Sequence, residues 1–155
     1  MKKQVYLILF LLLNAHFVFS QKTYVWDKYK IQITVPRDLR VQKNTDSEFE
    51  MKGVGLELSM NIFEENVPID DLDDATIAGA KEIKLQEIDH AKKIKINELE
   101  GYFVEGFKDG NRIVFAGMGN PNSHTNFFIA IIFDDDDKEA EKDAIDILNS
   151  LDVID

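Results

Sequence analysis

Thr125-Asn-Phe-Phe-Ile-Ala-Ile-Ile-Phe133 is the stretch around which the rest of this chain can be arranged. It is nearly all apolar and rich in aromatic and β-branched residues. Turn-forming residues precede it at 120–123, and four aspartates follow it at 134–137. A short apolar run between turn signals predicts a strand that is buried on both faces. We therefore place the other segments as partners of this strand.

The segments just before this run predict an antiparallel meander. Residues 93–97 alternate between polar and apolar side chains, 98–101 have the composition of a turn, and 102–107 continue extended. Lys108-Asp-Gly-Asn111 contains Asp-Gly between apolar runs, which is a strong hairpin signal. Residues 112–118 are then the returning strand, and the apolar run 125–133 is the last strand of the meander.

The first half of the chain predicts further strands. Residues 29–35 alternate cleanly and stop at Pro36, as a half-buried strand does. Residues 40–43 can form a short strand, and Trp26 is expected to pack in the core or at an edge. Residues 48–52 and 56–63 form a predicted hairpin, with Gly53 and Gly55 at its bend.

Two helices are predicted, each opened by acidic residues that suit the positive end of a helix. The first follows Pro68, and we interpret its four aspartates as cap and dipole charges rather than as a metal site. Its buried stripe is narrow and consists of Leu72, Ala75, Thr76, Gly79, Ala80 and Ile83. The second follows 134–137, and its buried stripe consists of Ala140, Ala144, Ile147, Leu148 and Leu151.

This order of elements predicts the α+β class: an antiparallel sheet packed against helices, in one domain over residues 21–155. The chain has 155 residues, and its 45% hydrophobic and 30% charged residues are those of a globular protein with a real core. No internal repeat, linker or second domain is visible.

Residues 1–20 have the layout of a secretory signal peptide. Lys2 and Lys3 precede an apolar run at 5–13, and small Ser20 stands at the expected cleavage site. The alternative is a retained anchor, but a membrane span needs about 20 apolar residues. Residues 5–19 offer fewer and include Asn14 and His16. We expect a cleaved, periplasmic or secreted protein without a transmembrane span.

Charge and cysteine content exclude several classes of function. The formal net charge is −11, and it becomes −13 when Lys2 and Lys3 are removed. An acidic surface repels phosphate backbones, so nucleic acid is not an expected partner. With no cysteine, the chain has no disulfide, thiolate zinc site, iron–sulfur cluster or cysteine nucleophile.

Catalytic residues are scarce in this chain. Histidine remains at His90 and His124 after cleavage, and His90 is expected in a solvated loop. Ser123 and His124 are neighbours, so on an extended chain their side chains point to opposite faces and cannot act as nucleophile and base. No nucleotide, hydrolase or metalloprotease motif is present, and no cofactor is expected. A carboxylate hydrolase would require two acids that converge in one pocket.

The acidic run contains the candidate metal ligands Asp134, Asp136 and Asp137. A calcium loop of the EF-hand type needs Gly at position six and Glu at position twelve. Counted from Asp134, these positions hold Glu139 and Ile145, so that motif fails. Two interpretations of these aspartates remain: a calcium or manganese site outside this motif, or a solvated helix cap. The cap is the favoured interpretation.

The loop before the central run is the other candidate site. Its polar side chains could bind a ligand, because a rigid strand supports the loop. An ordinary connection with turn chemistry is the favoured alternative. The candidate binding residues in this loop are Asn120, Asn122, His124 and Asn126.

The whole pattern over about residues 24–153 resembles the Mog1/PsbP-like family. The matching features are Tyr29-Lys-Ile-Gln-Ile-Thr-Val-Pro36, the helix after Pro68, Ile96-Asn-Glu-Leu-Glu-Gly-Tyr102 and a final helix ending in Leu148-Asn-Ser-Leu151. The resemblance implies α/β/α layers, with an antiparallel sheet between helices. Its known members act as binding or accessory proteins, one at a photosynthetic membrane complex and another on a small GTPase. No functional residue of either maps onto this chain.

We therefore expect an exported accessory protein, not an enzyme, that binds another macromolecule in the cell envelope. An exported protein would not meet a cytosolic GTPase, so binding is all that the resemblance implies about function. The alternative is a protein that binds a small ligand or a divalent cation, at the acidic run or at the loop 120–126. The sequence leaves the ligand, the pathway and the oligomeric state open.

Overall fold

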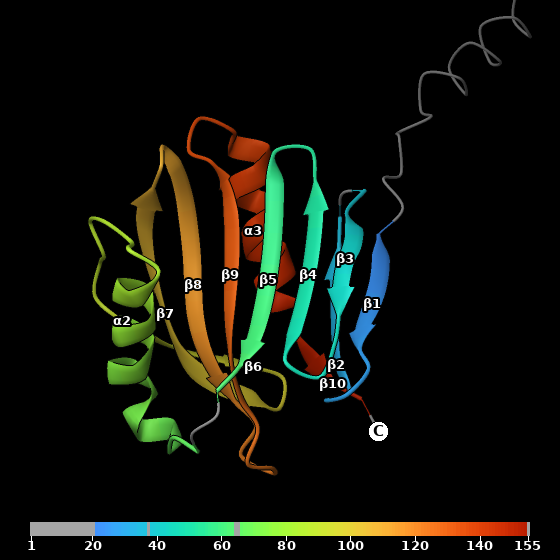
Figure 1. Cartoon of the computed structure of the whole chain (residues 1–155), viewed down its shortest axis with the longest axis vertical. Helices are drawn as coiled ribbons and strands as arrows, with labels where there is room; N and C mark the ends of the chain where they lie inside the picture. Colours follow the sequence, from blue (N-terminus) through green and yellow to red (C-terminus); the bar gives the residue numbers. More distant parts are fainter. Residues whose placement is uncertain (1–20, 37, 64–65, 155) are drawn as a thin grey trace, which may run out of the picture.

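The computed structural model describes residues 21–36, 38–63 and 66–154 (Figure 1). The predicted signal peptide, 1–20, lies outside these ranges, so it stays a prediction. Within them, no helix combines the length and apolar character needed to cross a membrane. The elements are β1 (Lys22–Trp26), β2 (Ile31–Val35), β3 (Arg40–Asn44), β4 (Glu48–Gly53), β5 (Leu56–Ile62), a short 3₁₀ turn (Ile69–Asp71), α2 (Leu72–Glu82), β6 (Lys92–Ile96), β7 (Leu99–Lys108), β8 (Asn111–Gly119), β9 (Asn126–Asp134), α3 (Lys138–Asn149) and β10 (Asp152–Val153).

A seven-stranded antiparallel sheet forms the centre of the molecule, in the order β3-β4-β5-β9-β8-β7-β6. The predicted central strand is β9, which pairs with β5 on one side and β8 on the other. The hairpin between β7 and β8 turns at Asp109 and Gly110, both with positive φ, as the Asp-Gly signal predicts. A second, three-stranded sheet has the order β1-β2-β10.

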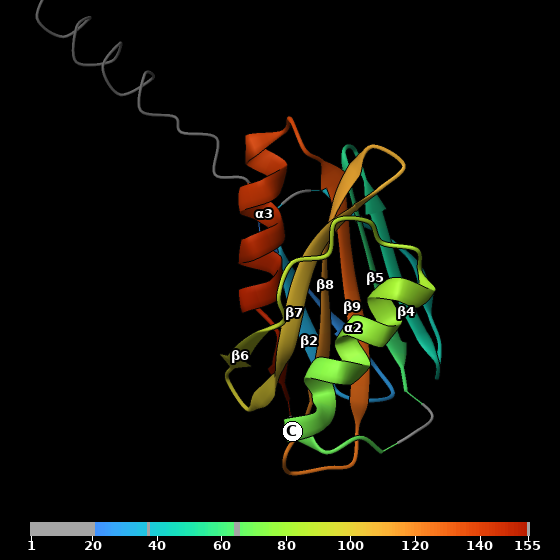
Figure 2. The ribbon, with the colours of Figure 1, turned by 90° about the vertical axis from the view of Figure 1, so that its left-hand side faces the viewer.

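The helices lie on opposite faces of the seven-stranded sheet, as Figure 2 shows. Side chains alternate along β9, so Phe127 and Ile129 belong to the core on the α3 side, while Phe128 and Ala130 belong to the core on the α2 side. A strand between two cores must be apolar at every position, which explains the continuous apolar run. The predicted α+β class and the predicted burial of this strand are confirmed.

The α3 side of the sheet, which we call the α3 face, is covered by α3 and by the three-stranded sheet. Trp26 and Phe127 are fully buried there, and the predicted stripe of α3 packs onto the same core. An ion cluster pins the start of α3: the guanidinium of Arg112 on β8 lies 2.6 Å from Glu105 on β7 and 3.0 Å from Glu141 on α3. This face is therefore closed by both apolar packing and charge pairing.

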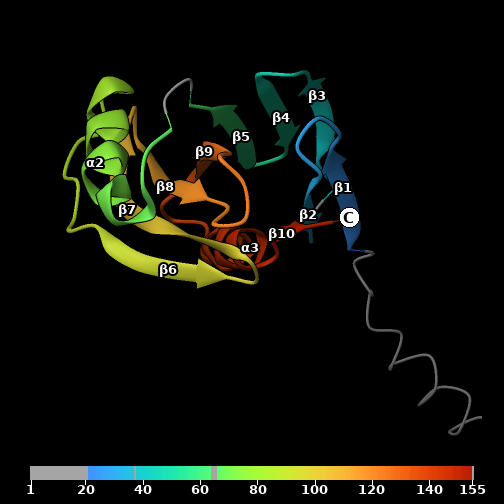
Figure 3. The same ribbon diagram turned by 90° about the horizontal axis from the view of Figure 1, so that it is seen from below.

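The α2 side of the sheet, which we call the α2 face, is covered differently, because α2 lies over β7 and β8. Small residues on both sides allow a close approach: a Cβ on Gly117 of β8 would overlap the hydroxyl oxygen of Thr76 on α2. Figure 1 looks onto this face and shows α2 beside β7 and β8, with no described helix in front of β9, β5 and β4. Figure 3 shows β5 and β4 continuing the sheet away from α2.

Two strands were not expected, and two local expectations need correction. The strand expected at 29–35 begins only at Ile31, because 27–30 form a turn. β1 and β10 were not predicted; both owe their extended shape to pairing with β2. The turn expected at 98–101 is tighter: Asn97, with positive φ, and Glu98 make it, and β7 already begins at Leu99. The Leu99 side chain is fully buried, so core packing pulls this residue into the strand.

Candidate functional site

The uncovered half of the α2 face changes from apolar to charged over three strands. On β9, Ile132, Ala130 and Phe128 point to this face. Their register partners on β5 are Glu57, Ser59 and Asn61, and the next partners on β4 are Lys52, Glu50 and Glu48. Neighbouring strands are about 4.8 Å apart. The apolar strip of β9 therefore borders polar and then charged side chains.

A groove of about 300 Å³ follows this apolar strip, and we call it the β9 groove. Ile113, Phe115, Phe128, Ala130 and Ile132 form its floor, Ser59 and Asn61 of β5 form one wall, and Gly79, Glu82 and Ile83 of α2 with Lys108 form the other. Two more hollows, of about 430 and 450 Å³, adjoin it, and both share Lys108 with it. The groove is therefore the centre of a longer depression.

The polar side chains of the β9 groove have no partner among the residues that the structure describes. The side chains of Ser59 and Asn61 make no hydrogen bond to another residue in the described part of the chain. Glu82 and Lys108 take part in none of the ion pairs found among the described residues. These groups can therefore bind an external partner without first breaking an internal contact.

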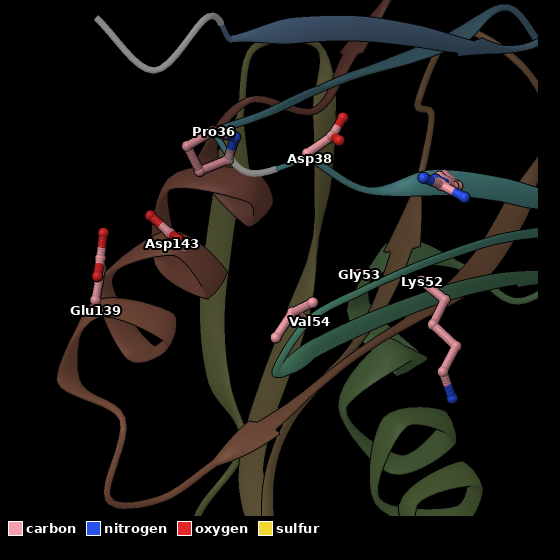
Figure 4. A pocket seen from close by; sticks show the side chains of 8 residues that line it. Pro36, Asp38, Lys52, Gly53, Val54, Glu139 and Asp143 are labelled. Atoms are coloured by element: carbon pink, nitrogen blue, oxygen red, sulfur yellow. The ribbon is translucent and has the colours of Figure 1, made fainter. Parts of the chain in front are cut away.

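A larger hollow, of about 670 Å³, lies on the other side of the β4–β5 hairpin (Figure 4). Figure 4 shows Glu139 and Asp143 of α3 on one side of it and Lys52 and Val54 on the other. Three of its five charged side chains have partners: Asp38 pairs with Lys22 at 2.7 Å, Lys52 pairs with Glu57, and Asp143 also has a partner. Its apolar lining is limited to Pro36 and Val54, whereas five apolar residues form the floor of the β9 groove.

The acidic run 134–137 forms the entrance to α3. An oxygen of Asp137 accepts hydrogen bonds from the backbone N–H groups of Glu139 and Ala140, so this residue is the N-cap of the helix. An oxygen of Asp134 accepts from the backbone N–H of Asp136 at 3.0 Å. Among the described residues no group of three or more acids, histidines or cysteines is arranged to hold a metal ion. The geometry is that of the cap, the favoured interpretation of this run.

The loop 120–126 is held together by its own hydrogen bonds. Asn120 accepts from the backbone N–H of Asn122 at 2.9 Å, and Nδ1 of His124 lies 3.1 Å from the side-chain nitrogen of Asn66. Asn126 is buried and donates to the carbonyl oxygen of Val67 at 2.7 Å. Asn120, Asn122 and His124 stay candidate binding residues. Asn126 also stays a candidate, although its side chain is buried and its amide nitrogen already donates to Val67.

The titratable groups show ion pairing rather than a catalytic pair. The pKa values of Asp38, Glu100 and Glu141 are lowered, mainly because a lysine donates a hydrogen bond to each. Burial opposes ionisation of Asp89, but hydrogen bonds from Lys92 and from the Glu105 N–H still lower its pKa. These shifts hold carboxylates charged, whereas a general acid requires a raised pKa.

Comparison with known proteins identifies the fold. No protein-family model matches the sequence, and no curated protein matches it. The Ran-binding protein Mog1p of Saccharomyces cerevisiae has a similar structure, with a TM-score of 0.59 and 11% identity over 88% of this chain and 97% of Mog1p. A Bacteroides thetaiotaomicron protein gives a TM-score of 0.53 and 12% identity over 86% of this chain.

These similarities show the fold alone. The chain spans about half the length of the Bacteroides protein, since it covers 48% of it. The fold is Mog1/PsbP-like, with an antiparallel sheet between two helices, so the resemblance seen in the sequence is confirmed. The sequence did not point to the β9 groove. Its floor comes from two predicted strands, β8 and the central strand β9, but nothing local marks Ala130 or Ile132 as residues that α2 leaves uncovered.

Proposed function

We propose that this protein is an exported accessory protein that binds another protein of the cell envelope through the β9 groove. Export is supported by the signal-like layout of residues 1–20. Binding rather than catalysis is supported by the poverty of catalytic residues and by lowered rather than raised carboxyl pKa values. The yeast protein of similar fold is Ran-binding, so this fold serves protein binding in one known case.

The observation that carries the proposal is the apolar strip left uncovered beside α2. Phe128 and Ile132 are half-buried and Ala130 is 9% exposed, next to a rim that contains both Lys108 and Glu57. An apolar centre with a polar rim of both charge signs is the usual anatomy of a protein–protein interface. A nucleic-acid site would instead require a basic surface.

Crosslinking in the native cell envelope tests this proposal. The tagged protein is crosslinked in cells, purified, and its partners are identified by mass spectrometry. Ser59→Arg places a large charged side chain in the groove without touching the α3 core. Thr23→Arg is the matched control, because Thr23 is an exposed hydroxyl residue on β1, in the other sheet.

We expect one reproducible partner that is captured by the wild type and by Thr23→Arg and is lost with Ser59→Arg. If no partner exceeds the background, the proposed function is wrong. If Ser59→Arg captures the same partner as the wild type, the binding surface lies elsewhere. Fractionation of the same cells tests export, because a protein that remains in the cytoplasm contradicts the envelope location.

A further inference from the structure

We infer that the β9 groove recognises one large apolar side chain, such as Leu, Met or Phe, that is flanked by Lys or Arg in a segment of the partner protein. This inference rests on the proposed function and specifies the chemistry of the partner. It is carried by a depression in the middle of the groove and by the charges around it.

The depression is made by three small residues from three elements. Ala130 on β9 lies directly beside Ser59 on β5, and Gly79 is on the helix above. Ile132 and Phe128 stand two residues away on either side of Ala130, about 7 Å along the strand. Because Ala130 and Ser59 are small and their neighbours on β9 are large, room is left over Ala130, whereas the rings of Phe128 and Phe115 already fill the space beside Gly79.

The ring of Phe128 is held firmly, so this end of the depression is a fixed wall. A Cβ on Gly79 would lie 2.7 Å from Cζ of Phe128, which places the ring directly against the helix backbone. The ring centroid of Phe128 lies 3.7 Å from that of Phe63 and 4.9 Å from that of Phe115. Because these contacts hold Phe128, the ring cannot swing over and fill the space above Ala130.

The size of the groove limits what can occupy it. Its volume of about 300 Å³ is at the lower limit of ordinary small-molecule sites. Such a space suits an inserted side chain with part of its backbone. The hydroxyl of Ser59 and the amide of Asn61, which have no hydrogen-bond partner among the described residues, lie beside the depression and can bond to that backbone.

Charge determines which flanking residues suit the site. The charged residues that line the groove and its two adjoining hollows are Glu57, Glu82, Asp109 and Asp134 against Lys84 and Lys108, so acids are in excess. The whole chain has a net charge of −11. A basic segment is attracted to this face, whereas a second copy of the chain carries the same net charge and is repelled.

Methyl NMR with defined peptides tests this inference without the natural partner. The chain from Gln21 onward contains every described helix and strand, and it is labelled on its alanine and isoleucine methyl groups. The probe is a pentapeptide with blocked ends and a central Leu between two Lys on each side. One matched probe has Ala at the centre, and another has Glu in place of Lys.

We expect the Leu–Lys probe to shift the methyl signals of Ala130, Ile132 and Ile83 and to leave Ala144, on α3, unmoved. The Ala-centred and Glu-flanked probes should bind at least about tenfold more weakly. Equal binding of the Glu-flanked probe, shifts confined to other methyl groups, or no shift at millimolar probe would overturn the inference.

Two variants fill the depression from opposite sides, Ala130→Leu and Ser59→Leu. Each should weaken the Leu–Lys probe at least about tenfold, and Ser59→Leu, on the exposed wall, keeps the test valid if Ala130→Leu misfolds. Probe binding as strong as in the wild type, in either folded variant, contradicts the inference. A natural partner that is lost with Ser59→Arg but still binds both Leu variants leaves the proposed function standing and overturns only the inference. If the probe binds but no envelope partner is found, the inference stands and the proposed function is wrong.

Discussion

The two faces of the seven-stranded sheet are covered to different extents. The α3 face is closed by an amphipathic helix, a second sheet and the Arg112 ion cluster, and Trp26 and Phe127 are fully buried there. The α2 face is closed only over β7 and β8, and its apolar strip on β9 stays partly exposed. The difference separates residues that should matter for stability from residues that should matter for binding.

The two helices differ in the same way. α3 has a side-chain N-cap, because Asp137 accepts two backbone N–H groups. The N-cap of α2, Asp71, makes no such bond, and the α2 stripe consists largely of small residues. The more weakly anchored helix therefore borders the β9 groove. Four measurements test this contrast, in order of decreasing expected effect.

The first measurement compares neighbouring phenylalanines on opposite faces. Phe127→Ala should lower the free energy of unfolding by about 3–5 kcal/mol, because it empties a fully buried site beside Trp26. Phe128→Ala should cost less than half as much, since that ring is half-buried. Urea denaturation of both variants measures the difference, and equal costs would remove the contrast between the faces.

The second measurement compares two cations on β8 and β7. Arg112→Met should lower the free energy of unfolding by about 1–2 kcal/mol, because Glu105 and Glu141 lose a mostly buried partner. Lys108→Met removes a lysine that has no ion pair among the described residues, and it should change stability by less than about 0.5 kcal/mol. Thermal and urea unfolding measure the stability of both variants. If Lys108→Met lost more stability than Arg112→Met, the ion cluster of Arg112 would not be the stabilising feature that we infer.

The third measurement compares the helix caps. Asp137→Ala should lower the free energy of unfolding by about 1 kcal/mol, the usual value for an N-cap aspartate. Asp71→Ala should cost only a few tenths, since its side chain makes no cap bond.

Calcium or manganese added to the wild type in the same assay should leave the melting temperature unchanged. A rise that a chelator reverses would instead support a cation site at Asp134, Asp136 and Asp137.

The fourth measurement concerns pH and the connection that follows α2. Asp89 ties this connection to β7, and its pKa is lowered by hydrogen bonds from Lys92 and from the Glu105 N–H that outweigh the effect of burial. A lowered folded-state pKa gives stability that is present above the unfolded value, about 3.9, and is lost as the pH falls through the folded value.

Asp89→Asn should therefore cost less than about 1 kcal/mol at pH 7, because solvent screens the pair, and that cost should shrink below about pH 4. Urea denaturation from pH 2 to pH 7 measures the change. Lys92→Met should flatten the same pH dependence, and a cost of Asp89→Asn that is constant with pH would contradict the assigned pKa shift.

Much of the fold could be predicted because its signals are local. The alternation at 29–35, the Asp-Gly of the β7–β8 hairpin and the acidic start of α3 each indicate their own element. β10 could not be predicted in this way, because its two residues carry no periodic pattern. The burial of β1 rises steadily from exposed Lys22 to buried Trp26 instead of alternating, and its extended shape comes from its partner β2, so it too lacked a clear signal.

The amino acids of β9 are enough to identify it as the central strand, because a strand between two cores is apolar at every position. That Ala130, Ser59 and Gly79 meet in one depression follows only from the way the chain folds. They come from three separate elements, and their exposure depends on how far α2 extends across the sheet. Asn126 shows the same limit. It is polar and next to a loop, yet it is buried because Val67, far away in the sequence, accepts its hydrogen bond.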